Sequence, residues 1–164
     1  MAYNAYVKFD DIDGGSTEKG HEKWASITKH YHESKQPASF TQQAAGRSAE
    51  AVEFGEYFFE MPTNPAIPKL QDAHWGGKIL KEVTMHCTRS GGSSPVTYLE
   101  VKLTNALVSS IVSNGDPTGE YQFPTEKVGL TFEKIEVTFT SQKPTGEAAG
   151  KIAAKWHVAQ GTAA

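Results

Sequence analysis

The side chains best suited to chemistry in this 164-residue chain are its six histidines, two of which, His30 and His32, are separated by one residue. In an extended strand, residues two apart point to the same face, so these imidazoles could bind one metal ion together. A structural metal site needs more ligands, and no cysteine and no evident third ligand lie near them in the sequence. We therefore interpret residues 30–32 as part of a strand that faces solvent or an interface, and we predict no metal site.

The other histidines fall one to a segment, at His21, His74, His86 and His157. Isolated histidines are more often hydrogen-bonded structural residues, and no spacing among these predicts a catalytic triad. The single cysteine, Cys87, cannot form an intrachain disulfide. Because Cys87 is in phase with Val83 and Met85, the pattern predicts a small buried side chain and not a nucleophile.

Glycine pairs and neighbouring carboxylates do not define an active site either. The glycine pairs lack the Lys-Ser/Thr of a phosphate-binding loop, so we interpret them as turns. The Gly-x-Ser-x-Gly motif of a hydrolase nucleophile is absent. The acidic pairs Asp10-Asp11 and Glu56 with Glu60 carry no sign of burial and are interpreted as solvated. The sequence therefore predicts no catalytic residue, no cofactor and no enzyme activity.

Charge and composition exclude two further classes. Nineteen acidic against sixteen basic residues give a net charge of −3, whereas a nucleic-acid-binding protein normally shows a positive surplus. The apolar runs are far shorter than the roughly 20 residues of a bilayer-spanning helix, and the N-terminal residues lack the charged and apolar regions of a secretory signal. We expect one domain over residues 1–164 with a single core, without nucleic-acid binding and without membrane insertion.

Alternation of apolar and polar residues with a period of two dominates the chain and is typical of β-strands. It predicts strands at residues 3–10, 21–32, 52–61, 79–88, 97–104, 106–113, 128–139 and 152–158. Between Phe132 and Ile135 the apolar positions change phase. This change predicts a bulge near Glu133-Lys134 that keeps both halves of the strand, including Val137 and Phe139, on the core.

One segment has the pattern of a short helix. Asn64-Pro65 supplies a capping residue and a proline that is tolerated at the first helical position, and apolar residues at helical spacing follow until Gly76-Gly77. We expect a helix at about residues 65–75. Together with the strands, it predicts a mainly β fold, a small β-barrel of two antiparallel sheets with one short α-helix.

Surface aromatic residues and one long loop favour self-association. Residues 36–46 have no usable period and carry turn formers at each end, so we expect a long exposed loop. Aromatic side chains on faces that a monomer would keep polar are enriched at protein–protein interfaces. The predicted oligomer-interface residues are Gln36, Pro37, Ser39, Phe40, Gln42, Gln43, Arg47, Trp24, Tyr31 and Tyr57.

Several stretches stand in a characteristic order along nearly the whole chain. They are Ala5-Tyr-Val-Lys-Phe-Asp-Asp-Ile-Asp-Gly-Gly-Ser16, Asn64-Pro65 before Ile67, Val96-Thr-Tyr-Leu-Glu-Val-Lys-Leu-Thr-Asn-Ala-Leu-Val-Ser-Ser-Ile-Val112, Thr125-Glu-Lys-Val-Gly-Leu-Thr-Phe132, Ile135 to Phe139, and a final strand around Trp156. In order and spacing they resemble the Hcp (hemolysin-coregulated protein) family, the tube proteins of type VI secretion systems. Pro68 departs from the family's pattern at the start of the helix.

The resemblance implies a β-barrel protomer that forms hexameric rings, and rings that stack into a hollow tube. In the family this tube lies inside a contractile sheath, carries a spike at its tip, and is expelled with small effector proteins in its lumen. The resemblance also implies assembly in the bacterial cytoplasm and secretion without a signal peptide, into the medium or a target cell. Because the last predicted strand lies close to Ala164, we expect a single Hcp-like domain without a C-terminal effector extension.

Two alternatives remain open. A phage-type tail tube subunit would share this architecture and differ only in context. A β-sandwich carbohydrate-active enzyme belongs to another class and would need a pocket with converging titratable groups. For a tube subunit, we expect residues 36–46 to reach an adjacent protomer or ring, because no monomer core requires them.

Overall fold

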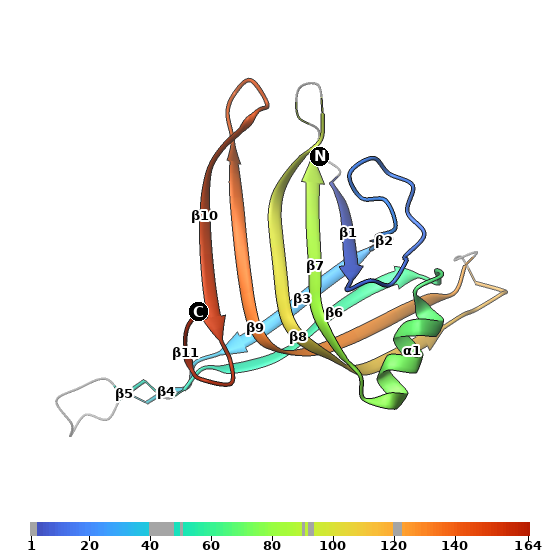
Figure 1. Cartoon of the computed structure of the whole chain (residues 1–164), viewed down its shortest axis with the longest axis horizontal. Coiled ribbons are helices and arrows are strands. Elements are labelled where there is room, and N and C mark those ends of the chain that lie inside the picture. The colour runs from blue at the N-terminus through green and yellow to red at the C-terminus, as the bar shows by residue number, and fades with distance from the viewer. Residues whose placement is uncertain (1–2, 40–47, 50, 90, 92–93, 120–122) are drawn as a thin grey trace.

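The computed structural model describes residues 3–39, 48–49, 51–89, 91, 94–119 and 123–164. Its elements (Figure 1) are β1 (Asn4–Phe9), β2 (Ala25–Ser26), β3 (Lys29–Lys35), β4 (Ala38–Ser39), β5 (Ser48–Ala49), β6 (Glu53–Pro62), α1 (Ile67–Gly76), β7 (Ile79–Arg89), β8 (Val96–Asn114), β9 (Thr125–Gln142), β10 (Ala148–His157) and β11 (Thr162–Ala163). The predicted fold class, mainly antiparallel β with a short helix, is confirmed. No helix in the described ranges is long and apolar enough to cross a membrane.

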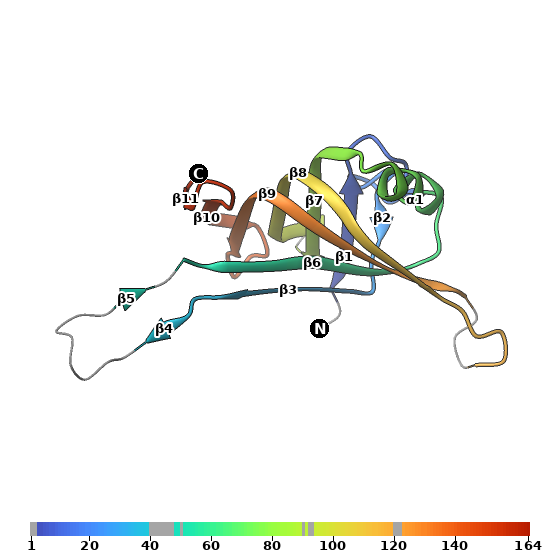
Figure 2. The ribbon, with the colours of Figure 1, turned by 90° about the horizontal axis from the view of Figure 1, so that it is seen from below.

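Nine strands form one branched antiparallel sheet. Its main path runs β11-β10-β9-β8-β7-β1-β2, and the long strand β9 is the branch point. Residues 125–130 of β9 pair with β6, whereas residues 134–142 pair with β10. β3 pairs with β6, and these two strands form a second layer that crosses the direction of β1 and β7 (Figure 2). β4 and β5 form a separate two-stranded sheet beyond the ends of β3 and β6.

This branched sheet differs in one respect from the predicted barrel of two sheets. Among the strands that the structure describes, the ladder does not close. The sheet stays open beyond β1, because β2 pairs with β1 over only two residues. Ile27 and Thr28 then carry the chain across to β6: their amides donate to the carbonyls of Ala5 (3.0 Å) and Glu60 (2.8 Å), respectively.

The core lies between the two layers. Residues directly opposite each other in an antiparallel sheet share one face, and the register places Phe9, Val83, Leu103 and Ile135 in one row across β1, β7, β8 and β9. From β6, the Phe59 ring meets the Phe9 ring edge to face at 6.0 Å. All five side chains are buried, and burial of each large apolar side chain contributes on the order of 1.5–3 kcal/mol.

Helix α1 begins slightly later than predicted. The Asn64 side chain accepts a hydrogen bond from the Ala66 amide at 3.0 Å, and the helix starts at Ile67. Pro68 therefore lies in the first turn, where the missing N–H has no intrahelical acceptor to lose. Gly77, with φ of 64°, ends the helix in the left-handed region that glycine adopts without strain.

The bulge predicted near Glu133-Lys134 lies elsewhere. β8 and β9 keep their register through that region and shift between Val108 and Ser110. The unusual backbone is at Asn105, which has φ of 50° and donates from its side chain to Glu133 at 2.6 Å. Asparagine tolerates the left-handed region better than most residues. β8 therefore runs as one strand of 19 residues where two segments were predicted.

Candidate self-association surface

One face of the sheet stays apolar beyond the part that the second layer covers. The row that starts at Leu99 in β8 continues through Phe139 to Ile152, and the next row runs from Val137 to Ala154. Phe139 is 44% exposed and Ile152 is 72% exposed. In Figure 1 this part of β9 and β10 rises away from β3 and β6, which explains the exposure. We call Val137, Phe139, Ile152 and Ala154 the β9–β10 surface.

The β9–β10 surface corrects the prediction that Val137 and Phe139 face the core. Ile135, from the same apolar phase, is buried, whereas Val137 and Phe139 are exposed. Period-two alternation shows which face of a strand is apolar, but it does not show where a second layer ends. The sequence reasoning therefore missed this surface, although the matching apolar positions Ile152 and Ala154 in β10 are the signal that could have extended the apolar face there.

Aromatic side chains border the β9–β10 surface. The Tyr98 ring meets the Phe139 ring at 6.4 Å and the Tyr3 ring at 6.3 Å, both edge to face. The Arg89 guanidinium lies over the Tyr98 ring at 4.9 Å. Tyrosine and arginine are enriched among residues that contribute most to protein–protein binding. This border extends the candidate contact area toward β1.

A second apolar area lies away from the β9–β10 surface, at one end of the molecule. The β8–β9 hairpin extends past the body (Figure 2), and near its tip Val112 and Phe123 are exposed. Phe123 and Pro62 line a hollow together with polar groups that include Lys29 and Glu60, and these two form an ion pair at 3.7 Å. We call Pro62, Val112 and Phe123 the hairpin-tip surface.

The predicted interface residues lie in separate places. Gln36 is exposed and Pro37 is half-buried, just after β3, and the backbone of Ser39 pairs with Ser48 between β4 and β5. Trp24 is half-buried and packs on the rings of two histidines. Phe40, Gln42, Gln43 and Arg47 lie outside the described residues. An interface role for these positions stays a prediction.

Tyr31 lies on the outward face of β3, as predicted. Its ring stacks on Phe58 at 4.8 Å, and the Lys127 ammonium lies 4.6 Å from the centre of the Phe58 ring and 5.1 Å from that of Tyr31. A hydrogen bond to Tyr31 raises the pKa of Lys127. Gly129 makes room for this cluster, because a Cβ there would lie 2.9 Å from the Phe58 ring.

Tyr57, in contrast, is wrong as an exposed interface residue, because it is only 5% exposed and faces the core. Its ring lies between those of His30 and His32, with the His32 ring stacked on it at 5.3 Å. His30 Nδ1 lies 3.2 Å from the Tyr57 hydroxyl. These two histidines are half-buried and turned inward, so the prediction that residues 30–32 face solvent or an interface holds for Tyr31 alone.

Burial sets the chemistry of this inner cluster. It lowers the pKa of both His30 and His32 and raises the pKa of the Tyr57 hydroxyl. Burial also raises the pKa of Cys87 to about 11, so its thiol, 3.7 Å from His30 Nε2, stays protonated at neutral pH. The prediction of a buried Cys87 is confirmed. Within the described residues, no group of three or more His, Cys, Asp or Glu side chains is placed to hold a metal ion.

The fold and its two exposed surfaces define a small antiparallel β protein with apolar strand faces of the kind that mark protein–protein contact sites. The sequence model of the family described as "Type VI secretion system effector, Hcp" matches residues 6–139. The chain therefore belongs to the Hcp family of type VI secretion proteins, and the family that the sequence analysis suggested is confirmed.

Individual relatives agree with this assignment. Protein hcp1 of Pseudomonas aeruginosa is 28% identical over 161 residues, which cover 98% of each chain. A solved structure of a type six secretion system protein superposes with a TM-score of 0.91 at 22% identity, covering 98% of this chain and 99% of the other. Hcp1 from Salmonella typhimurium gives a TM-score of 0.78 at 21% identity, covering 98% and 97%. At these identities the solved structures establish the fold.

Proposed function

We propose that this chain is a structural subunit of the type VI secretion tube and not an enzyme. Six copies form a ring, rings stack into a hollow tube, and a contractile sheath expels the tube with its spike and with small effector proteins in the lumen. Membership in the Hcp family supports the secretion context. The observation that carries the proposal is the pair of different exposed apolar surfaces on separate parts of the molecule.

Two unlike surfaces on separate parts of the molecule suit a head-to-tail contact. Such a contact joins one patch of a copy to a different patch of the next copy, and it closes into a ring when the rotation between copies permits. In this proposal the β9–β10 surface of one copy packs against the hairpin-tip surface of its neighbour. Burial of Phe139, Ile152 and Phe123 would then remove from water the apolar area that a lone copy exposes, at roughly 25 cal/mol per Å².

Stacking of rings is assigned to the arm formed by β4 and β5. Figure 2 shows these strands extending from β3 and β6 away from the rest of the chain. Backbone pairing of Ala38 with Ala49 and of Ser39 with Ser48 holds the two sides of the arm together. An arm of this kind reaches a neighbouring ring or protomer, and the segment between its strands contains most of the loop residues predicted above.

The same proposal places assembly in the bacterial cytoplasm and export outside the general secretory route. A single buried thiol, Cys87, suits a reducing compartment, because no disulfide is needed for the fold. A phage-type tail tube subunit would have the same architecture, and the family match favours the secretion system. The buried acidic side chain Glu126 accepts hydrogen bonds from the hydroxyls of Thr63 and Ser113, so we assign this carboxylate a structural role and not a catalytic one.

The experiment changes Ile152 to Glu and follows particle mass by light scattering coupled to size exclusion, with negative-stain images of the peak. We expect six-fold rings from the unaltered chain and single copies from Ile152→Glu, because an exposed carboxylate cannot be buried in an apolar contact without a partner. Ile79→Glu is the matched control, since Ile79 is an exposed isoleucine outside both surfaces. Single copies from the unaltered chain, or rings from Ile152→Glu, would contradict the proposal.

A further inference from the structure

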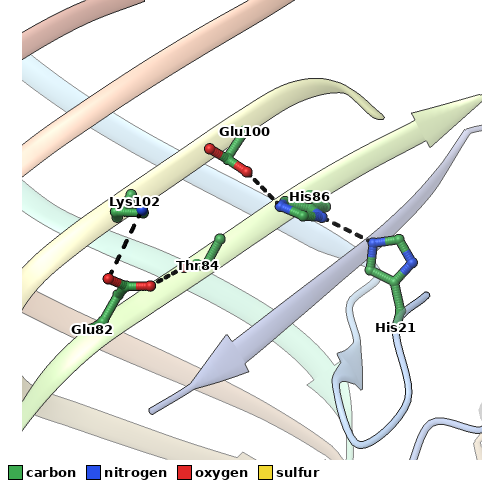
Figure 3. A network of polar contacts seen from close by, with 6 residues as sticks. All are labelled: His21, Glu82, Thr84, His86, Glu100 and Lys102. Carbon is green, nitrogen blue, oxygen red and sulfur yellow. Dashed lines mark hydrogen bonds and ion pairs between the residues drawn. The ribbon is translucent and has the colours of Figure 1, made fainter. Parts of the chain in front are cut away.

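Two histidines from distant parts of the chain are in direct contact on the polar face of the sheet (Figure 3). His21 Nε2 lies 3.0 Å from His86 Nδ1, and His86 Nε2 lies 2.7 Å from a carboxylate oxygen of Glu100. His21 belongs to the segment between β1 and β2, whereas His86 is in β7 and Glu100 in β8. The three groups therefore tie the segment between β1 and β2 to the sheet.

The hydrogen-bond pattern fixes where the protons are at neutral pH. Glu100 is an acceptor, so His86 carries its proton on Nε2 and its Nδ1 is left as an acceptor for the Nε2–H of His21. The facing nitrogens share the proton of His21 Nε2–H, so a first added proton can bind His21 Nδ1 without breaking the contact. A second added proton makes both nitrogens donors and places two positive rings 3.0 Å apart, a contact that cannot persist.

The contact holds a segment, residues 13–24, that has little other attachment to the sheet. Within this segment the backbone bonds to itself, through the amides of Gly14, Ser16 and Lys23. Lys23 has φ of 67°, a conformation that costs energy for a residue with a side chain. The packing onto the sheet comes from the His21 ring, which stacks on Tyr6 at 4.5 Å, and from the Trp24 ring, which lies tilted against His86 at 4.5 Å.

We propose that the His21–His86 contact is an acid-operated clamp, which holds residues 13–24 on the sheet at neutral pH and releases them when both rings are protonated. The clamp is a property of the single chain and goes beyond the tube function proposed above.

The charged surroundings favour opening on the acid side of neutrality. Burial, together with the facing His86, lowers the pKa of His21, while Glu18 and Glu22 on its own segment act in the opposite direction. The facing titratable groups on the sheet are Tyr6 from β1, His86 from β7 and Glu100 from β8, and Lys151 of β10 lines the same hollow as His86 and Glu100. Protonation of His21 is therefore moved to the acid side of the ordinary histidine value near 6.5.

Hydrogen exchange read by mass spectrometry tests the clamp on the full chain. After correction for the intrinsic pH dependence of exchange, we expect peptides from residues 13–24 to exchange at least about tenfold faster at pH 5.5 than at pH 7.5. A tenfold change corresponds to an interaction of about one pKa unit between the two rings. Peptides from β7 are expected to accelerate less than those from residues 13–24, because β7 exchanges only through opening of the whole sheet.

Variants of each ring complete the test. In His86→Gln and in His21→Gln only one titratable ring remains, so exchange of residues 13–24 is expected to change little between the two pH values. His74→Gln, on α1 and away from the clamp, is expected to behave like the unaltered chain. Equal exchange of residues 13–24 at both pH values, equal acceleration of β7, or full acceleration in both glutamine variants would overturn the proposal.

Discussion

At the scale of single residues, burial and not sequence spacing decides what the histidines do. The pair His30 and His32 has the spacing of metal ligands, yet the structure turns both rings inward against Tyr57. His32 Nε2 is buried and has no hydrogen-bond partner among the described residues. A neutral ring is favoured there, because the cost of burying a charged ring outweighs the hydrogen bond to the Gly55 backbone, which acts in the opposite direction.

These inward histidines predict a chain that loses stability in acid. Burial lowers the pKa of His21, His30 and His32 in the folded chain, whereas unfolded histidine titrates near pH 6.5. Below 6.5 the unfolded chain therefore binds more protons than the folded chain. We expect the free energy of unfolding, measured with urea, to be nearly constant between about pH 7 and pH 8 and to fall as the pH decreases below 6.5.

His32→Phe provides the matched variant for this prediction. It removes the buried nitrogen without a partner among the described residues but also the hydrogen bond to the Gly55 backbone, and the new ring can still stack on Tyr57. The two effects offset each other, so the free energy of unfolding at pH 7.5 is expected to change by less than about 1 kcal/mol. Its decline in acid is expected to be weaker. His74→Phe, which loses a 2.7 Å contact with the Val108 carbonyl, is expected to lower stability instead. A more stable chain at pH 5 than at pH 7.5 would exclude this account.

At the scale of elements, the sequence predicted a helix or strand correctly where its residue pattern fits only one structure. Helix α1 was predicted to within two residues, because capping, proline and glycine signals agree there. β6 was predicted as a strand, but Phe58 and not Tyr57 faces outward. Aromatic residues occupy 57, 58 and 59 in succession, so alternation cannot assign the faces, and the pairing of Tyr57 with the buried Leu130 decides.

The candidate site was less predictable than the fold. The sequence predicted that Tyr31 lies on an exposed face, whereas it assigned Val137 and Phe139 of the β9–β10 surface to the core. The β9–β10 surface is exposed because β9 exchanges its partner along its length: residues 125–130 pair with β6, and residues 134–142 pair with β10. That exchange is a long-range pairing, and no local pattern in Val137 or Phe139 encodes it.

One element-scale prediction concerns the close packing over β9. Gly129→Ala would place a Cβ against the Ser110 hydroxyl and 2.9 Å from the Phe58 ring, so the Ser110 side chain and the Phe58–Tyr31 stack must both shift. We expect a loss of about 1–3 kcal/mol in the free energy of unfolding measured with urea, as for other overpacked sites. Gly150→Ala in β10 is the control, because its Cβ would meet nothing within 4 Å. An equal effect of both substitutions would show that packing against Phe58 is not the cause.

At the scale of the whole molecule, the arrangement of the surfaces matters more than their area. The β9–β10 surface and the hairpin-tip surface lie on separate parts of the molecule (Figure 2). If each surface bound its own kind, two-fold dimers would form. If each binds the other, assembly is head-to-tail and a ring is the closed product.

Mixing two disabled copies tests this central claim most directly. Ile152→Glu disables the β9–β10 surface and Phe123→Glu disables the hairpin-tip surface, and each variant alone is expected to run as a single copy in light scattering. Mixed in equal amounts, they are expected to form pairs and nothing larger, because each copy offers the one surface that the other still needs. Dimers of either variant alone, or a mixture that stays as single copies, would contradict head-to-tail assembly.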